Sequence, residues 1–223
     1  MTFCTDIDLL HWEPNIARDA GFASQTLIAG TGNLAGAVFT LASGSLTAAH
    51  VTPGQVMVVT GANSASYPIV SVEGATQCTL SALYDDLFPP GGAGGGAGGA
   101  PPAAVPVGSG NGLSFVVRTF WPQRRVVSEL LLQAAGLPPT ADAADRIVNP
   151  SALKRPCALG TLHMIYSALA AAAPDAPALE VRVELYEKLY RRALRSARLE
   201  LDLNGDGRAD TARALNVLEM KRE

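Results

Sequence analysis

The sequence predicts an α+β protein: a helical bundle with an inserted small antiparallel β-barrel or sandwich and a C-terminal β-hairpin. Three observations predict this class. Short apolar segments between residues 27 and 88 are separated by glycine and proline, as in small all-β units. Apolar residues between 113 and 198 recur at helical spacing. Those between 199 and 223 alternate in part on either side of an Asp-Gly loop, which predicts a hairpin.

The composition is that of a globular protein with an uneven charge distribution. The chain has 223 residues, enough for one large domain or two small ones, and a net charge of -3. Residues 1–112 carry one basic and seven acidic residues, a net charge of -6, whereas residues 113–223 carry 16 basic and 13 acidic residues, a net charge of +3. We infer two surfaces that face different environments.

Cysteine use and the N-terminus predict a soluble, unexported protein. Cys4, Cys78 and Cys157 lie far apart without CxxC spacing, so neither a disulfide framework nor a zinc site is indicated, and a reducing compartment fits best. The first residues lack a basic region followed by an apolar stretch. No apolar run approaches the roughly 20 residues that span a bilayer.

Residues 1–26 are expected to form N-terminal helices of the bundle. Thr5 or Asp6 can cap a short helix, and Pro14 opens a second one. Helical character ends near Leu27.

Residues 27–88 are expected to form the inserted β subdomain. The glycine-rich segment Gly30–Gly36 superficially resembles a dinucleotide-binding loop, but it precedes a strand where the phosphate site needs a helix N-terminus, so we interpret it as a turn. Five short strands are predicted: Val38–Leu41, Leu46–Val51, Val56–Thr60, Tyr67–Val72 and Cys78–Leu83.

Residues 89–112 are rich in glycine, proline and alanine and have almost no side chains that could anchor them to a core. This composition predicts a linker or long loop. It is either a solvated tether or an arm that orders on a neighbouring subunit.

Residues 113–198 are expected to form a strand, Leu113–Phe120, followed by the main helices of the bundle. The first helix begins at Pro122 and ends at Gly136, with Val127, Leu130, Leu131 and Ala134 on one face. A further segment begins at Asn149-Pro150 and breaks at Pro156, and the next helix stops before Pro174.

The longest predicted helix spans about residues 176–197. Its apolar stripe runs from Tyr186 to Ala197 and faces away from a basic side made of Lys188, Arg191, Arg192 and Arg195. This basic side either contacts nucleic acid or is a solvated helix face. Ion pairs at i,i+4 spacing, Glu184 with Lys188 and Glu187 with Arg191, favour the solvated face.

The segment 199–223 is expected to be the C-terminal hairpin, and its loop is the most specific motif in the chain. Asp202, Asn204 and Asp206 occupy alternate positions, Gly207 permits a sharp turn, and Asp210 stands at the ninth place. This order matches the start of a calcium-binding oxygen cage. A full EF-hand is not expected, because Arg213 stands where its bidentate Glu would be.

The same nine residues, Asp202–Asp210, resemble the calcium loops set between strands in FG-GAP repeats, whose D-x-N-x-D-G-x-x-D pattern they match residue for residue. That resemblance implies calcium ligands from the side chains of Asp202, Asn204, Asp206 and Asp210 and from the carbonyl of Arg208. The alternative is a bare polar turn, because Asn-Gly and Asp-Gly favour positive φ without any metal.

No set of acid, base and nucleophile predicts an enzyme. His11, His50 and His163 are scattered, and none lies in a nucleophile motif. The carboxylate pairs Glu13 with Asp19 and Asp85 with Asp86 lack a recognisable apolar pocket that would raise one pKa for acid catalysis.

Three segments together resemble head-to-tail adaptor (connector) proteins of tailed bacteriophages and gene transfer particles. They are the acidic and apolar start Thr5–Pro14 with Asp19–Gln25, the long helix Tyr186–Leu201 running into the hairpin, and the hairpin itself with a final strand Leu215–Arg222. They cover less than half of the chain. The β-rich stretch from Leu27 to Leu83 departs from the simplest helical members of that family.

The resemblance implies a structural virion protein, made in the host bacterial cytoplasm, that joins the portal ring to the tail or stopper. Its partners would be copies of itself in a ring of twelve subunits, the portal protein, a tail or stopper protein, and DNA passing through the channel without sequence recognition. A different class is left open by the calcium-type loop and the small β subdomain: a calcium-dependent carbohydrate or surface-binding module. A hydrolase is a more distant third.

Overall fold

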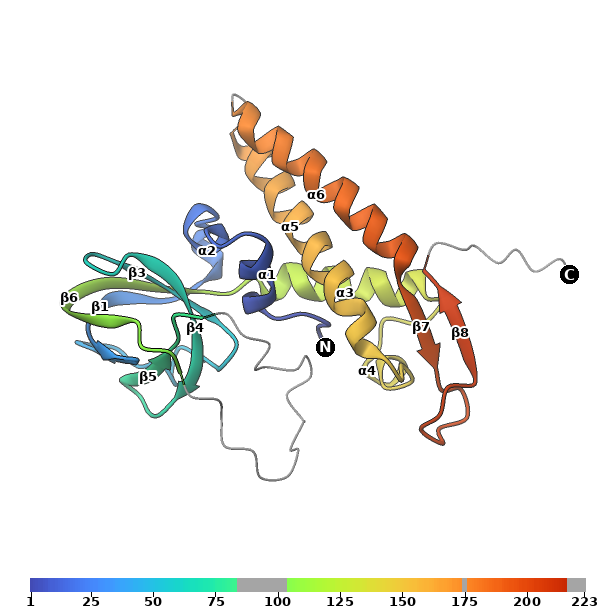
Figure 1. The fold of residues 1–223 in the computed structure, drawn as a ribbon, viewed down its shortest axis with the longest axis horizontal. Helices are drawn as coiled ribbons and strands as arrows, with labels where there is room; N and C mark the ends of the chain where they lie inside the picture. Colours follow the sequence, from blue (N-terminus) through green and yellow to red (C-terminus); the bar gives the residue numbers. More distant parts are fainter. Residues whose placement is uncertain (84–103, 174–175, 216–223) are drawn as a thin grey trace, which may run out of the picture. The chain divides into compact units, whose positions relative to one another are not determined.

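The computed structural model describes residues 1–83, 104–173 and 176–215, which form two compact units (Figure 1). One unit is the segment Thr5–Phe120; the other combines Met1–Cys4 with the described residues from Trp121 onward. Strands dominate the first unit, and helices with a C-terminal hairpin make up the second. None of the described helices is long and apolar enough to cross a membrane.

The first unit is built on a closed antiparallel barrel, so the barrel alternative of the predicted β subdomain is confirmed. Its strands follow one another around the barrel in the order β1-β2-β5-β4-β3-β6. Closure comes from the long last strand, which pairs with both β1 and β3. The strands are β1 (Thr26–Gly36), β2 (Val38–Leu41), β3 (Val56–Thr60), β4 (Ala65–Val72), β5 (Gln77–Leu80) and β6 (Gly108–Arg118).

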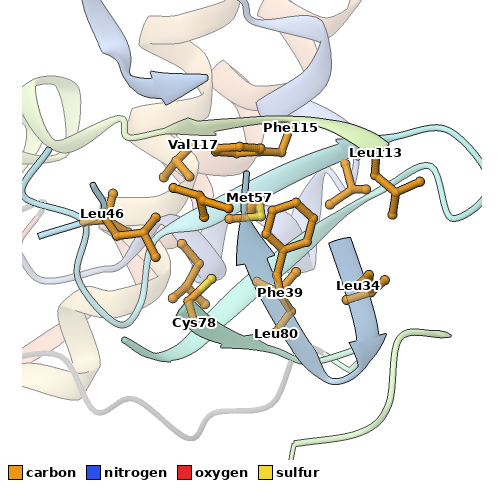
Figure 2. Packing of buried hydrophobic residues seen from close by; sticks show 13 residues of the cluster. Leu34, Phe39, Leu46, Met57, Cys78, Leu80, Leu113, Phe115 and Val117 are labelled. Carbon is orange, nitrogen blue, oxygen red and sulfur yellow. The ribbon is translucent and has the colours of Figure 1, made fainter. Parts of the chain in front are cut away.

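Apolar side chains from all these strands fill the barrel (Figure 2). Phe39 of β2 and Phe115 of β6 meet edge to face with their ring centroids 5.2 Å apart. Met57 is fully buried near these rings. Aromatic pairs in this geometry stabilise a core beyond the area that they bury. The interior is therefore a packed core.

Glycines in β1 make room for those rings, and this overturns the prediction of a turn at Gly30–Gly36. A Cβ atom at Gly32 would lie 2.5 Å from Cε1 of Phe39, and one at Gly30 would lie 3.3 Å from Cε1 of Phe115. Gly30 pairs with Phe115 across the β1–β6 ladder. The glycines thus belong to a strand in which a neighbouring aromatic takes the place of a side chain.

The barrel also contains residues that were assigned elsewhere. Residues 108–112, expected in the linker, and the strand from residue 113, expected with the helices, form the single strand β6. A glycine-rich segment can pair through its backbone alone, which composition does not reveal. Residues 89–103 of the expected linker lie outside the described residues.

Leu46–Val51 is not a strand, contrary to the prediction. The segment turns, with Val51 N donating to the Leu46 carbonyl at 2.9 Å and with His50 at φ 55°. Leu46 and Val51 are both buried in the barrel core. Two apolar anchors at the ends of a turn produced the apolar pattern of a strand.

The N-terminal helices belong to the same unit as the barrel. Helix α1 (Asp6–Trp12) begins with a capping box between Thr5 and Asp8, as the sequence predicts. Helix α2 (Ile16–Asp19) and the short 3-10 helix η1 (Ala23–Gln25) lead into β1. Asp6 accepts hydrogen bonds from Thr119 and Phe120, directly after β6, and Arg118 donates to the carbonyl of Ala17 in α2. Residues 5–26 therefore group with the barrel, where helices of the bundle were expected.

The second unit contains three long helices, of which α5 packs against both α3 and α6. Gly160 of α5 allows close approach, because a Cβ atom there would lie 2.8 Å from Val127 of α3 and 2.9 Å from Tyr190 of α6. Tyr166 and Tyr186 stack with centroids 5.3 Å apart. The helices are α3 (Trp121–Ala134), α4 (Ala141–Ala144), the 3-10 helix η2 (Pro150–Leu153), α5 (Lys154–Ala172) and α6 (Pro177–Ser196).

Helix α6 matches its prediction in span, buried stripe and charged face. Tyr186 and Ala193 are buried, and the basic side chains opposite them are exposed. Lys188 pairs with Glu184 at 3.2 Å and Arg191 pairs with Glu187 at 2.6 Å. The i,i+4 ion pairs expected from the sequence are therefore present.

Helices α3 and α5 differ from their predictions in two details. Leu130 is 47% exposed, because the buried face of α3 carries the polar Arg124 and Ser128 beside Val127 and Leu131. Pro156 does not break a helix; it lies in the first turn of α5, where a missing N–H leaves no intrahelical bond unmade.

Candidate functional site

The C-terminal hairpin presents the loop that the sequence singles out. Strands β7 (Arg198–Leu201) and β8 (Thr211–Ala214) pair antiparallel, and the loop Asp202–Asp210 connects them. Leu199 and Leu201 are buried, which anchors β7. The hairpin is confirmed (Figure 1), and β7 shows the expected alternation of exposed and buried residues. Its second strand is Thr211–Ala214, where a strand Leu215–Arg222 was expected, and residues 216–222 of that expectation lie outside the described residues.

A segment far away in sequence holds the base of this loop. Ile147 forms an isolated antiparallel bridge with Leu201. Asp202 N donates to the carbonyl of Arg146 at 2.8 Å, and Val148 N donates to the carbonyl of Glu200 at 2.9 Å. The hairpin is thus extended by a short third strand-like segment, which leaves the loop beyond it exposed.

Asp202 organises the first half of the loop. Its Oδ1 accepts hydrogen bonds from Gly205 N at 2.6 Å and Asn204 N at 3.1 Å, and its Oδ2 accepts from Gly207 N at 2.7 Å. The N–H of Gly207, opposed by partial burial and joined by further backbone N–H groups of the loop, holds the pKa of Asp202 below its ordinary value. The ionised carboxylate therefore stabilises the turn.

Asp210 and Asn204 hold the two ends of the loop together. Asp210 Oδ2 accepts from Leu203 N at 2.7 Å and from Asn204 N at 3.1 Å, while its Oδ1 accepts from the side-chain amide of Asn204 at 3.1 Å. Asn204 Oδ1 in turn accepts from Asp206 N at 2.9 Å, and Asp206 Oδ1 accepts from Arg208 N at 2.8 Å. All four predicted side-chain ligands therefore lie in one hydrogen-bonded loop.

Glycines supply the backbone conformation that this network needs. Gly205 and Gly207 have φ of 82° and 80°, in the left-handed region that side chains disfavour. Each donates its N–H to the Asp202 carboxylate. The two glycines, separated by one residue, thus direct backbone N–H groups of the loop toward the Asp202 carboxylate.

The fit of the loop to a calcium ion depends on where its oxygens are directed. Each of the four predicted side chains already accepts at least one N–H of its own loop. Within the described ranges, no three His, Cys, Asp or Glu side chains are grouped closely enough to hold a metal ion. Carboxylates have lone pairs left after these bonds, so calcium binding by the loop stays a prediction.

Arg213, which stands at the place of the twelfth ligand of an EF-hand, binds a backbone carbonyl near the end of α3. Its Nη1 donates to the carbonyl of Ala135 at 2.9 Å, just after the end of α3. A guanidinium there satisfies a carbonyl that no helix turn can reach. The hairpin is therefore fastened to α3 by the residue that departs from the EF-hand pattern.

A shallow cavity of about 310 Å³ adjoins the loop and adds two residues that the sequence analysis missed. It is lined by Asp145 and Arg146 together with residues 202–205 of the loop. The sequence gives no sign of this proximity, because Asp145 and Arg146 are brought to the loop by the bridge between Ile147 and Leu201, which forms only in the folded chain. An acidic and a basic side chain at its rim give it a mixed polar character.

The remaining candidates are not brought together. His11 lies on α1, His50 in the turn before Val51, and His163 on α5 in the other unit. Asp85 and Asp86 lie outside the described residues.

No protein-family model, curated protein or solved structure matches this chain.

Proposed function

We propose that the protein is a structural component of a virion, a head-to-tail adaptor that joins a portal ring to a tail or stopper. The observation that carries the proposal is a set of large apolar side chains left in solvent on two helices of the second unit. Val126 and Leu130 are 44% and 47% exposed on α3, and Val181 and Leu185 are 67% and 48% exposed on α6.

The spacing of these side chains supports a contact with another molecule. Each pair stands at i,i+4, so its members are neighbours on one face of the helix. Single exposed apolar residues are ordinary, whereas neighbouring ones on successive turns are typical of interaction surfaces. In a ring, these faces would be covered by adjacent subunits.

The charge distribution supports the same proposal. The segment Thr5–Phe120 carries seven acidic and two basic residues, a net charge of -5, and the rest of the chain carries 13 acidic and 15 basic residues, a net charge of +2. Oppositely charged units favour heterologous contacts between copies, the kind that closes a ring.

The remaining parts of the proposal follow from the resemblance. Helices α3, α5 and α6 would be the bundle of the adaptor, the ring would contain twelve subunits, and DNA would pass through its channel. Assembly would begin in the host bacterial cytoplasm and end at the interface between head and tail. The barrel would be an additional subdomain that the simplest helical adaptors lack.

Electron microscopy of the protein mixed with the portal protein of the same particle tests the proposal. We expect ring-shaped density of this chain on the portal. The protein alone can be monomeric, so the mixture is the informative sample. Particles that never dock on a portal would overturn the proposal.

A pair of variants separates a contact surface from general destabilisation. Leu130→Glu places a charge in the proposed contact and should abolish docking. Gln77→Glu adds the same charge at an exposed position on β5, outside α3 and α6, and should leave docking intact.

The alternative of a calcium-dependent carbohydrate-binding module has less support. Phe39 is fully buried, and the Tyr67 hydroxyl donates to the carbonyl of Asn63. Sugar platforms need exposed rings on which a sugar can stack. Tyr84 lies outside the described residues. Glycan binding that is lost on calcium chelation would favour this alternative over the adaptor.

A further inference from the structure

Two helices of the second unit each carry a row of apolar side chains at i,i+4 spacing on their solvent side, here called the α3 ridge and the α6 ridge. The α3 ridge consists of four exposed residues, Pro122, Val126, Leu130 and Ala134. The α6 ridge consists of the exposed Pro177, Val181 and Leu185 and the half-buried Leu189. Because a helix rises by about 1.5 Å per residue, each ridge is roughly 18 Å long.

Two ion pairs lie beside these ridges, and each is formed within a single helix. On α3, Arg125 Nε lies 2.9 Å from Glu129 Oε1. On α6, Lys188 Nζ lies 3.2 Å from Glu184 Oε2. A charge that loses water without a partner makes burial of a surface costly. Since these four side chains keep their partners, the ridges can be covered without that cost.

The two ridges do not cover each other within one chain. Val127 of α3 and Tyr190 of α6 are the side chains that lie closest to Gly160 of α5, so both helices use other faces for their contacts inside the unit. Val181 is 67% exposed, more than any other large apolar side chain among the described residues. A cover for the ridges therefore comes from another molecule.

The geometry of the two ridges fits them to each other. In the commonest class of helix packing, i±4 ridges of both helices interdigitate at a crossing angle of about -50°. Both ridges are of this kind and of equal length, so each supplies the surface that the other needs. A contact between two different patches of the same chain is heterologous, and it forms a ring when its rotation closes.

We propose that the α3 ridge of one copy packs on the α6 ridge of the next, so that the partner of both surfaces is a second copy of this chain. This inference rests on the proposed ring and adds to it which surfaces meet. In a closed ring every subunit uses each ridge once, and none stays in solvent. A two-fold contact between like ridges would cover one ridge of each chain and leave the other exposed.

Paired cysteine variants test which ridges meet. The natural cysteines are all buried, so a cysteine placed on a ridge is the accessible thiol. Leu130→Cys and Val181→Cys are purified separately, mixed with each other and with the portal protein of the same particle, and mildly oxidised. We expect a linked dimer that dithiothreitol separates and whose linked peptides, identified by mass spectrometry, contain positions 130 and 181. Each variant oxidised without the other should stay unlinked.

A control variant excludes random collisions. Gln77→Cys places an exposed thiol on β5, away from both ridges, and should give no linked dimer when it is mixed with Val181→Cys. A mixture of Leu130→Cys and Val181→Cys without the dimer would overturn the inference. A dimer formed by either variant alone would overturn it equally, because like ridges would then meet.

Electron microscopy of the same mixtures keeps this inference separate from the adaptor proposal. Rings on the portal without a link between positions 130 and 181 would overturn the pairing of the ridges and retain the adaptor. The specific link without density on the portal would retain the pairing and overturn the adaptor.

Discussion

The hydroxyl of Thr119 donates a hydrogen bond of 2.7 Å to the carboxylate of Asp6, which also accepts the backbone N–H of Phe120 at 2.9 Å. Asp6 is buried at the start of α1, and Thr119 follows directly on β6. This contact ties the two ends of the barrel unit together across 113 residues of sequence.

We expect Asp6→Ala to lower the free energy of unfolding by roughly 3 kcal/mol, because it leaves buried donors without their acceptor. Thr119→Val removes only one of the two donors and should have a smaller effect, roughly 1 kcal/mol. Urea titration measures both. Asp19→Ala, at an exposed position of the same unit, is the control. Equal effects of Asp6→Ala and Asp19→Ala would contradict the assigned role.

The second prediction concerns the close packing of Gly32 in the barrel. A Cβ atom there would lie 2.5 Å from Cε1 of Phe39 and 2.6 Å from the carbonyl oxygen of Thr40, and the latter cannot rotate away. Gly32→Ala should therefore destabilise the protein by roughly 3 kcal/mol or more. Gly74→Ala, where no atom lies within 4 Å, should change stability by less than about 0.5 kcal/mol. Thermal unfolding followed by circular dichroism compares the two, and a tolerated Gly32→Ala would refute the packing argument.

These two contacts show why the sequence predicted some elements and missed others. Helix α6 could be predicted because its stripe and its i,i+4 ion pairs are local. Strands β1 and β6 begin or end in glycine-rich segments whose pairing partners lie about 80 residues away, so local composition indicated a turn and a linker. The association of α1 with β6 depends on Asp6, whose partner no periodicity identifies.

The candidate site also has a part that the sequence predicts and a part that only the fold reveals. The spacing of Asp202, Asn204, Asp206 and Asp210 predicted a loop that gathers these side chains, and the hydrogen bonds among them are consistent with it. The cavity at Asp145 could not be predicted, since it depends on the bridge between Ile147 and Leu201.

The Asp202 carboxylate predicts an acid-sensitive hairpin. Backbone N–H groups, chiefly that of Gly207, lower its pKa in the folded state relative to about 3.9 in the unfolded chain. Its contribution to stability is therefore complete above that unfolded value and is lost as the pH falls through the lower folded value.

Asp202→Asn should consequently lower the melting temperature near neutral pH, and the difference from the intact protein should shrink as the pH is reduced below about 3.9. Calorimetry from pH 7 to pH 2 measures both proteins. A difference that stays constant over this range would show that charge is not what the backbone N–H groups recognise.

The last prediction concerns calcium at the same loop. If Asp202, Asn204, Asp206 and Asp210 share a calcium ion, the ion stabilises the folded chain by mass action, by about 2.7 kcal/mol when its concentration is 100 times the Kd. Asp206→Ala should abolish the rise in melting temperature that calcium produces. Asp142→Ala, an exposed carboxylate on α4, should preserve it. Melting curves with calcium and with a chelator decide the question: a calcium-insensitive intact protein would make the loop a turn held by its own hydrogen bonds alone.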